Sequence, residues 1–112
     1  SLSSGIFSFP STWLYKVSFT MEAYSTVSDS ILGDIYVTLD NSTYTRYAIT
    51  VSGDGGSGRA NTGTSSIFIN VTDISNIKVK FAISSLTAGS NVEGNTDVNR
   101  TFMEFIRLGD SV

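Results

Sequence analysis

The sequence predicts an all-β domain in which two antiparallel sheets pack as a sandwich or jelly roll, with no substantial helix. Three observations support this prediction. Apolar residues recur at every second position in several segments, and no segment has the 3.6-residue period of an amphipathic helix. The composition is rich in Ser, Thr, Gly and aromatic residues, with one Pro and 15% charged residues. At 112 residues the chain is expected to form one domain, residues 1–112.

The first half of the sequence divides into strands that end at turn residues. A short strand at 5–9 stops at Pro10, which has no N–H to donate to a sheet. The strand at 13–23 shows the clearest alternation, so its odd-numbered residues are expected to face the core. A polar loop at 24–30 follows, and the strand at 31–39 again places its odd-numbered residues inward.

The second half repeats this pattern with longer polar connections. After a turn at 40–42, the strand at 43–51 is expected to point Tyr47, Ile49 and Val51 inward. The remaining segments are a long Gly-rich loop at 52–65, strands at 67–71 and 77–83 around a turn at 72–76, a loop at 85–98, and a closing strand at 99–108.

The closing strand carries large apolar side chains on both faces. Phe102, Ile106 and Leu108 share one face, while Met103 and Phe105 share the other. One face can cover the core, and the second face is most simply buried by another copy of the chain. The predicted contacts between copies are Phe102, Met103, Phe105 and Arg107, and which face meets the neighbour is left open. Arg107 is expected to pair with a carboxylate of the neighbouring copy.

Strand parity places the three longer loops, 24–30, 52–65 and 85–98, at one end of the sandwich and the short turns at the other. Binding surfaces are often loops held by a rigid scaffold, so the loop end is the expected contact surface. The candidate receptor-binding residues are Tyr24, Asp29, Asp54, Arg59, Asn61, Asn91, Glu93, Asn95 and Asp97. Tyr24, Tyr36, Tyr44 and Tyr47 are candidates for stacking on sugars, although half-buried strand tyrosines explain them equally well.

The composition also excludes several classes of function. The sequence has no Cys and no His, which removes disulfides, Cys/His zinc sites and the usual catalytic dyads and triads. The net charge of −3 provides no basic stripe for nucleic acid, and no apolar run is long enough to span a membrane. Glu93 with Asp97, or Asp29 with Asp34, could bind calcium, but their spacing matches no calcium loop. No catalytic, cofactor or metal site is therefore predicted.

Three segments resemble the tumour-necrosis-factor-like and complement-head-like trimeric jelly rolls. These are Phe-Pro-Ser-Thr-Trp-Leu-Tyr-Lys-Val-Ser-Phe at 9–19, the strand at 35–39 and the aromatic closing strand. Residues 101–111 are most similar to the C-termini of bacteriophage tail-fibre proteins that carry this head. The resemblance implies a non-enzymatic homotrimer with the closing strand near the threefold axis, at the tip of an extracellular virion fibre. Such a head would bind a glycan or protein of the host cell surface.

The resemblance leaves two further points. The strand that normally begins the family's domain has no clear counterpart before Gly5, so this strand and a fibre shaft are expected to precede Ser1. The alternative functions are a carbohydrate-binding or adhesion module of a secreted or cell-surface protein, and a purely structural trimerisation or capsid-decoration cap.

Overall fold

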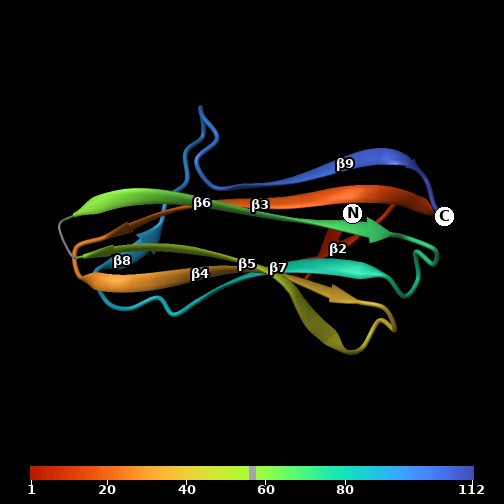
Figure 1. The fold of residues 1–112 in the computed structure, drawn as a ribbon, viewed down its shortest axis with the longest axis horizontal. Helices are drawn as coiled ribbons and strands as arrows, with labels where there is room; N and C mark the ends of the chain where they lie inside the picture. Colours follow the sequence, from red (N-terminus) through yellow and green to blue (C-terminus); the bar gives the residue numbers. More distant parts are fainter. Residues whose placement is uncertain (56–57) are drawn as a thin grey trace.

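The computed structural model describes residues 1–55 and 58–112, which form two antiparallel sheets packed face to face (Figure 1). The strands are β1 (Leu2–Ser3), β2 (Ile6–Ser8), β3 (Trp13–Ser25), β4 (Ser28–Thr38), β5 (Tyr44–Gly55), β6 (Arg59–Asn70), β7 (Lys78–Ser84), β8 (Ser90–Val92) and β9 (Phe102–Asp110). Sheet A has the order β1-β2-β7-β4-β5. Sheet B has β3 at its centre, with β6 along one edge and β9 and then β8 along the other. The predicted all-β sandwich is confirmed.

The core is built on the inner face of β3. Its odd-numbered residues from Tyr15 to Ala23 are buried, as the alternation predicts. They meet buried aliphatic side chains from the neighbouring and facing strands: Ile31, Ile35, Val37, Ile67, Ile69 and Val79. The polar even-numbered residues of β3 point to the outer face of sheet B. Leu39, which was also expected inside, lies one residue past the end of β4 and is exposed.

An aromatic cluster ties β9 to the other sheet. The ring of Phe105 lies 5.2 Å from that of Phe7, 6.0 Å from that of Phe9 and 5.9 Å from that of Phe81, measured between centroids. Phe7 and Phe81 belong to sheet A, so Phe105 bridges the two layers. The face of β9 that carries Phe105 is therefore the core face. Phe102 pairs with Thr20, and its side chain lies on the outer face.

The prediction that Tyr47, Ile49 and Val51 of β5 point inward is wrong. Ile35 of β4 pairs with Ala48, but the next residue, Tyr36, pairs with Arg46, so Tyr47 is an extra residue in a β-bulge. The bulge reverses the parity of the rest of β5. Ile49 and Val51 are 43% and 56% exposed. The small residues between and after them, Thr50 and Ser52, face the core instead.

The loops predicted at 24–30 and 52–65 are mostly strand. β3 and β4 are separated by residues 26 and 27 alone, and β5 and β6 continue to Gly55 and from Arg59. Residue-by-residue pairing with β3 holds β6 in the sheet despite its Gly and Ser content. The loop at 85–98 also contains β8, and β1 was not predicted. Residues 56 and 57 of the predicted 52–65 loop lie outside the described residues. The end of β3, the start of β4, the described ends of β5 and β6, and β8 lie at the same end of the sandwich, on the left in Figure 1, as the parity of the strands predicts.

Candidate functional site

One end of the sandwich, formed by the ends of β3 to β6 together with β8 and called here the β8 pole, gathers most of the predicted receptor-binding residues. Tyr24 lies opposite Asn91 of β8 in the sheet register. The others at this pole are Asp29, Asp54, Arg59 and Asn61. The backbone of Asp54 pairs with that of Asp29, while the Asp54 side chain lies outside the described part of the structure. A contact role for these residues stays a prediction.

Several of these polar side chains hold neighbouring segments in place. Asp29 Oδ2 accepts hydrogen bonds from the hydroxyl of Thr87 at 3.0 Å and from its backbone N–H at 3.3 Å. Hydrogen bonds lower the pKa of Asp29. The bond from the Ser90 hydroxyl has the largest effect, and the two bonds from Thr87 have smaller ones. Asn61 Nδ2 of β6 donates to the carbonyl of Gly53 of β5 at 2.8 Å, which joins the two sheets at this end. Asp29 and Asn61 therefore stabilise the pole itself.

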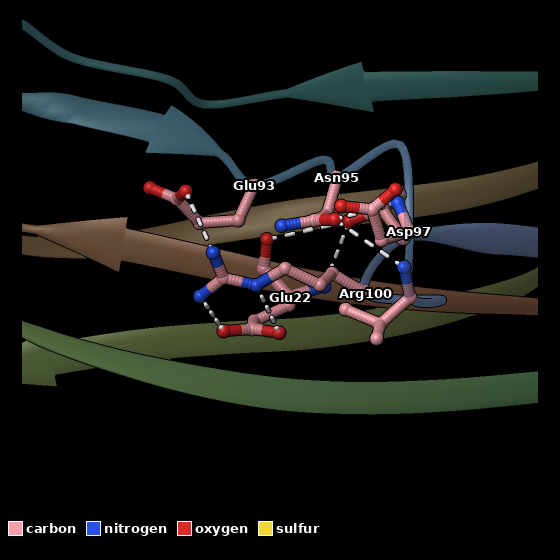
Figure 2. Close-up of polar contacts among 7 residues, drawn as sticks. Glu22, Glu93, Asn95, Asp97 and Arg100 are labelled. Atoms are coloured by element: carbon pink, nitrogen blue, oxygen red, sulfur yellow. Dashed lines mark hydrogen bonds and ion pairs between the residues drawn. The ribbon is translucent and has the colours of Figure 1, made fainter.

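The remaining predicted residues lie in the loop between β8 and β9, which Arg100 attaches to β3. Figure 2 shows the guanidinium of Arg100 between the carboxylates of Glu22 and Glu93. Arg100 donates to Glu22 through two nitrogens, at 2.6 Å and 3.1 Å, and lies 3.5 Å from Glu93. Asn95 Oδ1 accepts hydrogen bonds from the backbone N–H groups of Asp97 and the following Val98, which closes a tight turn.

Neither Glu22 nor Arg100 was predicted from the sequence as a site residue. They are 78 positions apart, and neither belongs to a local motif. Glu22 does lie on the polar face of β3, which was the one available signal. The hydrogen bonds from Arg100 lower the pKa of Glu22, and those same bonds raise the pKa of Arg100.

Because the pKa of Glu22 is lower in the folded state, its contribution to stability is present above its unfolded pKa of about 4.3. This contribution is lost as the pH falls through the lower, folded pKa. Glu22→Gln is therefore expected to lower the melting temperature at pH 7, and the difference from the wild type should shrink as the pH falls below about 4. Circular dichroism melts between pH 3 and pH 7 test this.

Glu93→Gln provides the comparison. Its carboxylate contacts Arg100 at the longer distance of 3.5 Å, so the loss at pH 7 should be smaller. A Glu22→Gln deficit that stays constant with pH would contradict a role for the Glu22 charge.

A cation–tyrosine face lies on the outer side of sheet A and consists of Tyr36, Tyr44, Arg46, Lys78 and Lys80. The strand register brings them together, since Tyr36 pairs with both Arg46 and Lys80, and Thr38 pairs with both Tyr44 and Lys78. The Lys80 ammonium lies 4.3 Å from the ring centroid of Tyr44 and 5.4 Å from that of Tyr36. Such distances allow cation–π attraction. Tyr44 and Arg46 therefore both point outward from sheet A.

One buried carboxylate lies beneath this face. Asp34 is 1% exposed, and its Oδ1 lies 3.1 Å from Arg46 Nε in an ion pair. Its Oδ2 accepts a hydrogen bond from the hydroxyl of Ser84 at 3.2 Å. Arg46 is thus neutralised locally and also lies over the ring of Tyr36.

An apolar face covers the outer side of sheet B around β9 and consists of Phe68, Ile106 and Leu108. Phe68 and Ile106 flank Lys16 in one cross-strand row, and Leu108 is the extra residue of a second bulge. Their side chains are 69%, 40% and 49% exposed. Single exposed apolar residues are common, but a row of them suggests a contact surface.

The residues predicted to contact neighbouring copies do not share one face. Phe102 is on the outer side of β9, whereas Met103, Phe105 and Arg107 pair with inward-facing residues of β3. Arg107 lies over the indole of Trp13 at 4.2 Å and donates to Asp110 at 2.9 Å. Arg107 thus has a carboxylate partner three residues along its own chain, and a partner in a neighbouring copy stays a prediction.

An aromatic groove opens between β2 and β9. Its volume is about 360 Å³, and it is lined chiefly by Phe7, Phe9, Trp13, Tyr15 and Phe105. Burial raises the pKa of Tyr15. Because its lining is mostly aromatic, the groove offers chiefly apolar contact.

Within residues 1–55 and 58–112, no three acidic side chains gather as a possible metal site. The same residues contain no helix that is long and apolar enough to cross a bilayer. The chain matches no family model, no curated protein and no solved structure.

Proposed function

We propose that this chain is a non-enzymatic attachment domain that assembles as a homotrimer and forms the head of a virion fibre, such as a phage tail fibre. The observation that supports assembly is the apolar face of sheet B. Phe68 is 69% exposed beside Ile106 and Leu108, and covering these side chains would remove apolar surface from water. The proposals that the assembly is a trimer and that it belongs to a virion rest on the resemblance of the closing strand to trimeric fibre heads.

Charges on the same face favour a second copy of this chain as the partner. Lys16 and Glu104 both point outward from sheet B, in adjacent rows of the β3–β9 register. Neither forms an ion pair within the described residues. A copy rotated about an axis near β9 can bring Lys16 of one chain, which lies between Phe68 and Ile106, towards Glu104 of the next, which adds an ion pair to the apolar contact.

This arrangement keeps the β8 pole and the outer face of sheet A free to contact a host surface. The apolar face belongs to sheet B and lies around β9, away from Tyr24 and Asn91 at the end of β3. A rigid scaffold of paired strands supports both free surfaces, as is common for binding sites.

The molar mass in solution tests the assembly. Light scattering should give three times the chain mass of 12.0 kDa for the wild type, and the mass of a folded monomer for Phe68→Asp. The charge introduced at Phe68 would lose its water in the trimer contact, even beside its cross-strand neighbour Lys16, whereas it is solvated in the monomer.

Val51→Asp is the matched control, because Val51 is 56% exposed on the outer face of the other sheet. It should remain trimeric. A stable wild-type monomer, or equal dissociation of both variants, would contradict the proposal, and a monomer would favour a carbohydrate-binding or adhesion module. Binding of the labelled trimer to candidate host cells then separates an attachment head from a structural cap.

A further inference from the structure

We propose that the cation–tyrosine face of sheet A is a binding site for an acidic polysaccharide. This inference rests on the proposed attachment function and deepens it by naming the class of ligand. The site consists of the five residues already placed on this face, with Lys78 and Lys80 as the groups that meet the anion.

Positive charge is concentrated on this face of an otherwise acidic protein. Three of the seven basic residues are here, although the net charge of the chain is −3. Arg46 is balanced by Asp34, but Lys78 and Lys80 form no ion pair within the described residues. Lys78 donates to the amide oxygen of Asn41 at 2.6 Å, which fixes the ammonium without neutralising it.

Two carboxylates in neighbouring turns, those of Asp40 and Asp73, form no ion pair with these lysines within the described residues, because donors of their own turns bind them. Asp40 Oδ1 accepts from the backbone N–H groups of Ser42 and Thr43, which lower its pKa and hold it in the turn after β4. Asp73 accepts from the N–H of Ser75 and from the side-chain amide of Asn76. Lys80 lies between the rings of Tyr36 and Tyr44 and has no carboxylate partner among the described residues.

The tyrosines make a sugar polymer a better ligand than a bare anion. Tyr36 and Tyr44 are half-buried, so their rings are held in place while part of each surface stays accessible. Their hydroxyls can donate to or accept from sugar hydroxyls, and a ring loses little entropy on contact. Arg46 Nη2 lies 3.5 Å from the Tyr36 hydroxyl, which adds a third fixed polar group.

The face is also open and extends along the sheet, which suits a chain of sugars more than a single small molecule. The next rows of the same outer face carry Ile49 and Val51 of β5, both exposed. An extended polymer can thus place an acidic group near Lys78 and Lys80. The less polar face of another of its sugar rings can then lie over Ile49 and Val51.

Biolayer interferometry with immobilised dextran sulfate, polygalacturonate, neutral dextran and duplex DNA tests the inference. The wild type should bind one or both acidic polysaccharides, more weakly as salt is raised, and should not bind dextran. The double variant Lys78→Gln/Lys80→Gln should lose about tenfold or more in affinity, as expected for the loss of charge-assisted hydrogen bonds. Comparing the sulfate and carboxylate arms identifies the preferred anion.

Arg107→Gln is the matched control, because it removes one positive charge from a side chain that lies over Trp13, outside both the cation–tyrosine face and the apolar face. Its affinity should change by no more than about twofold, the effect of a distant exposed charge. Tyr44→Ala should weaken polysaccharide binding, with melting curves to show that each variant is folded. Absence of wild-type binding, an equal loss in Arg107→Gln, or DNA binding as strong as polysaccharide binding would each overturn the inference.

The experiment also separates this inference from the proposed function. A trimer that attaches to host cells but binds no acidic polysaccharide would overturn the inference alone. A monomer that binds polysaccharide through Lys78 and Lys80 would overturn the proposed trimeric head and leave the site in place.

Discussion

Phe105→Asp is expected to prevent stable folding. Phe105 packs against Phe7, Phe9 and Phe81, so it joins β9 to the opposite sheet. Removing a core Phe side chain costs about 3–5 kcal/mol, and an ionised Asp at the same place adds the cost of burying an unpaired charge. Since small domains are stable by only about 5–15 kcal/mol, urea denaturation should show a protein that is largely unfolded without denaturant.

Phe102→Asp is the control, three residues away on the same strand. Phe102 is on the outer face of β9 opposite Thr20, where an Asp can reach water. This variant should keep a cooperative unfolding transition, whatever happens to its assembly. If Phe105→Asp unfolded at the same urea concentration as the wild type, the bridging role of Phe105 would be wrong.

Gly33→Val is expected to be the next most damaging change. A Cβ atom at Gly33 would lie 2.9 Å from Thr50 Cγ2, 3.1 Å from Phe19 Cε2 and 3.2 Å from Met21 Sδ. All three side chains are buried, and those of Phe19 and Met21 are fully buried. Overpacking at such a site costs about 1–3 kcal/mol or more, although Val itself favours strands.

Gly109→Val provides the matched control, because a Cβ atom at Gly109 in β9 would meet nothing within 4 Å. Its free energy of unfolding should stay near that of the wild type. Equal losses in the two variants would show that glycine is needed for its backbone freedom rather than for the space it leaves.

The fold class was predictable because β3 and β4 carry an unbroken two-residue period. A strand that faces a core on one side only must alternate, and the buried residues from Tyr15 to Ala23 follow this rule. The sequence also predicted that β9 would bury one face and leave a second apolar face. The sequence could not tell which face of β9 covers the core, because this depends on where Phe7 and Phe81 lie in space.

The errors arose where pairing overrides local preference. The bulge at Tyr47 has no signature in the sequence, so the outward turn of Ile49 and Val51 could not be foreseen. The segment 59–65 is rich in residues typical of loops, yet it is held as strand by β3. The attachment of the β8–β9 loop through Glu22 and Arg100 depends on two residues 78 positions apart, which a local pattern cannot relate.

The bulge at Tyr47 also constrains how this domain can change in length. Deleting one residue there would restore strict alternation and turn Ile49 and Val51 towards the core. That space is already closed, because Gly33 and Gly63 lie against Thr50 and leave no room for a branched side chain. A deletion in β5 would therefore need compensating changes on β4 and β6 at the same time. Insertions and deletions accepted during evolution should instead accumulate between β8 and β9, where Gly94 has open space around it.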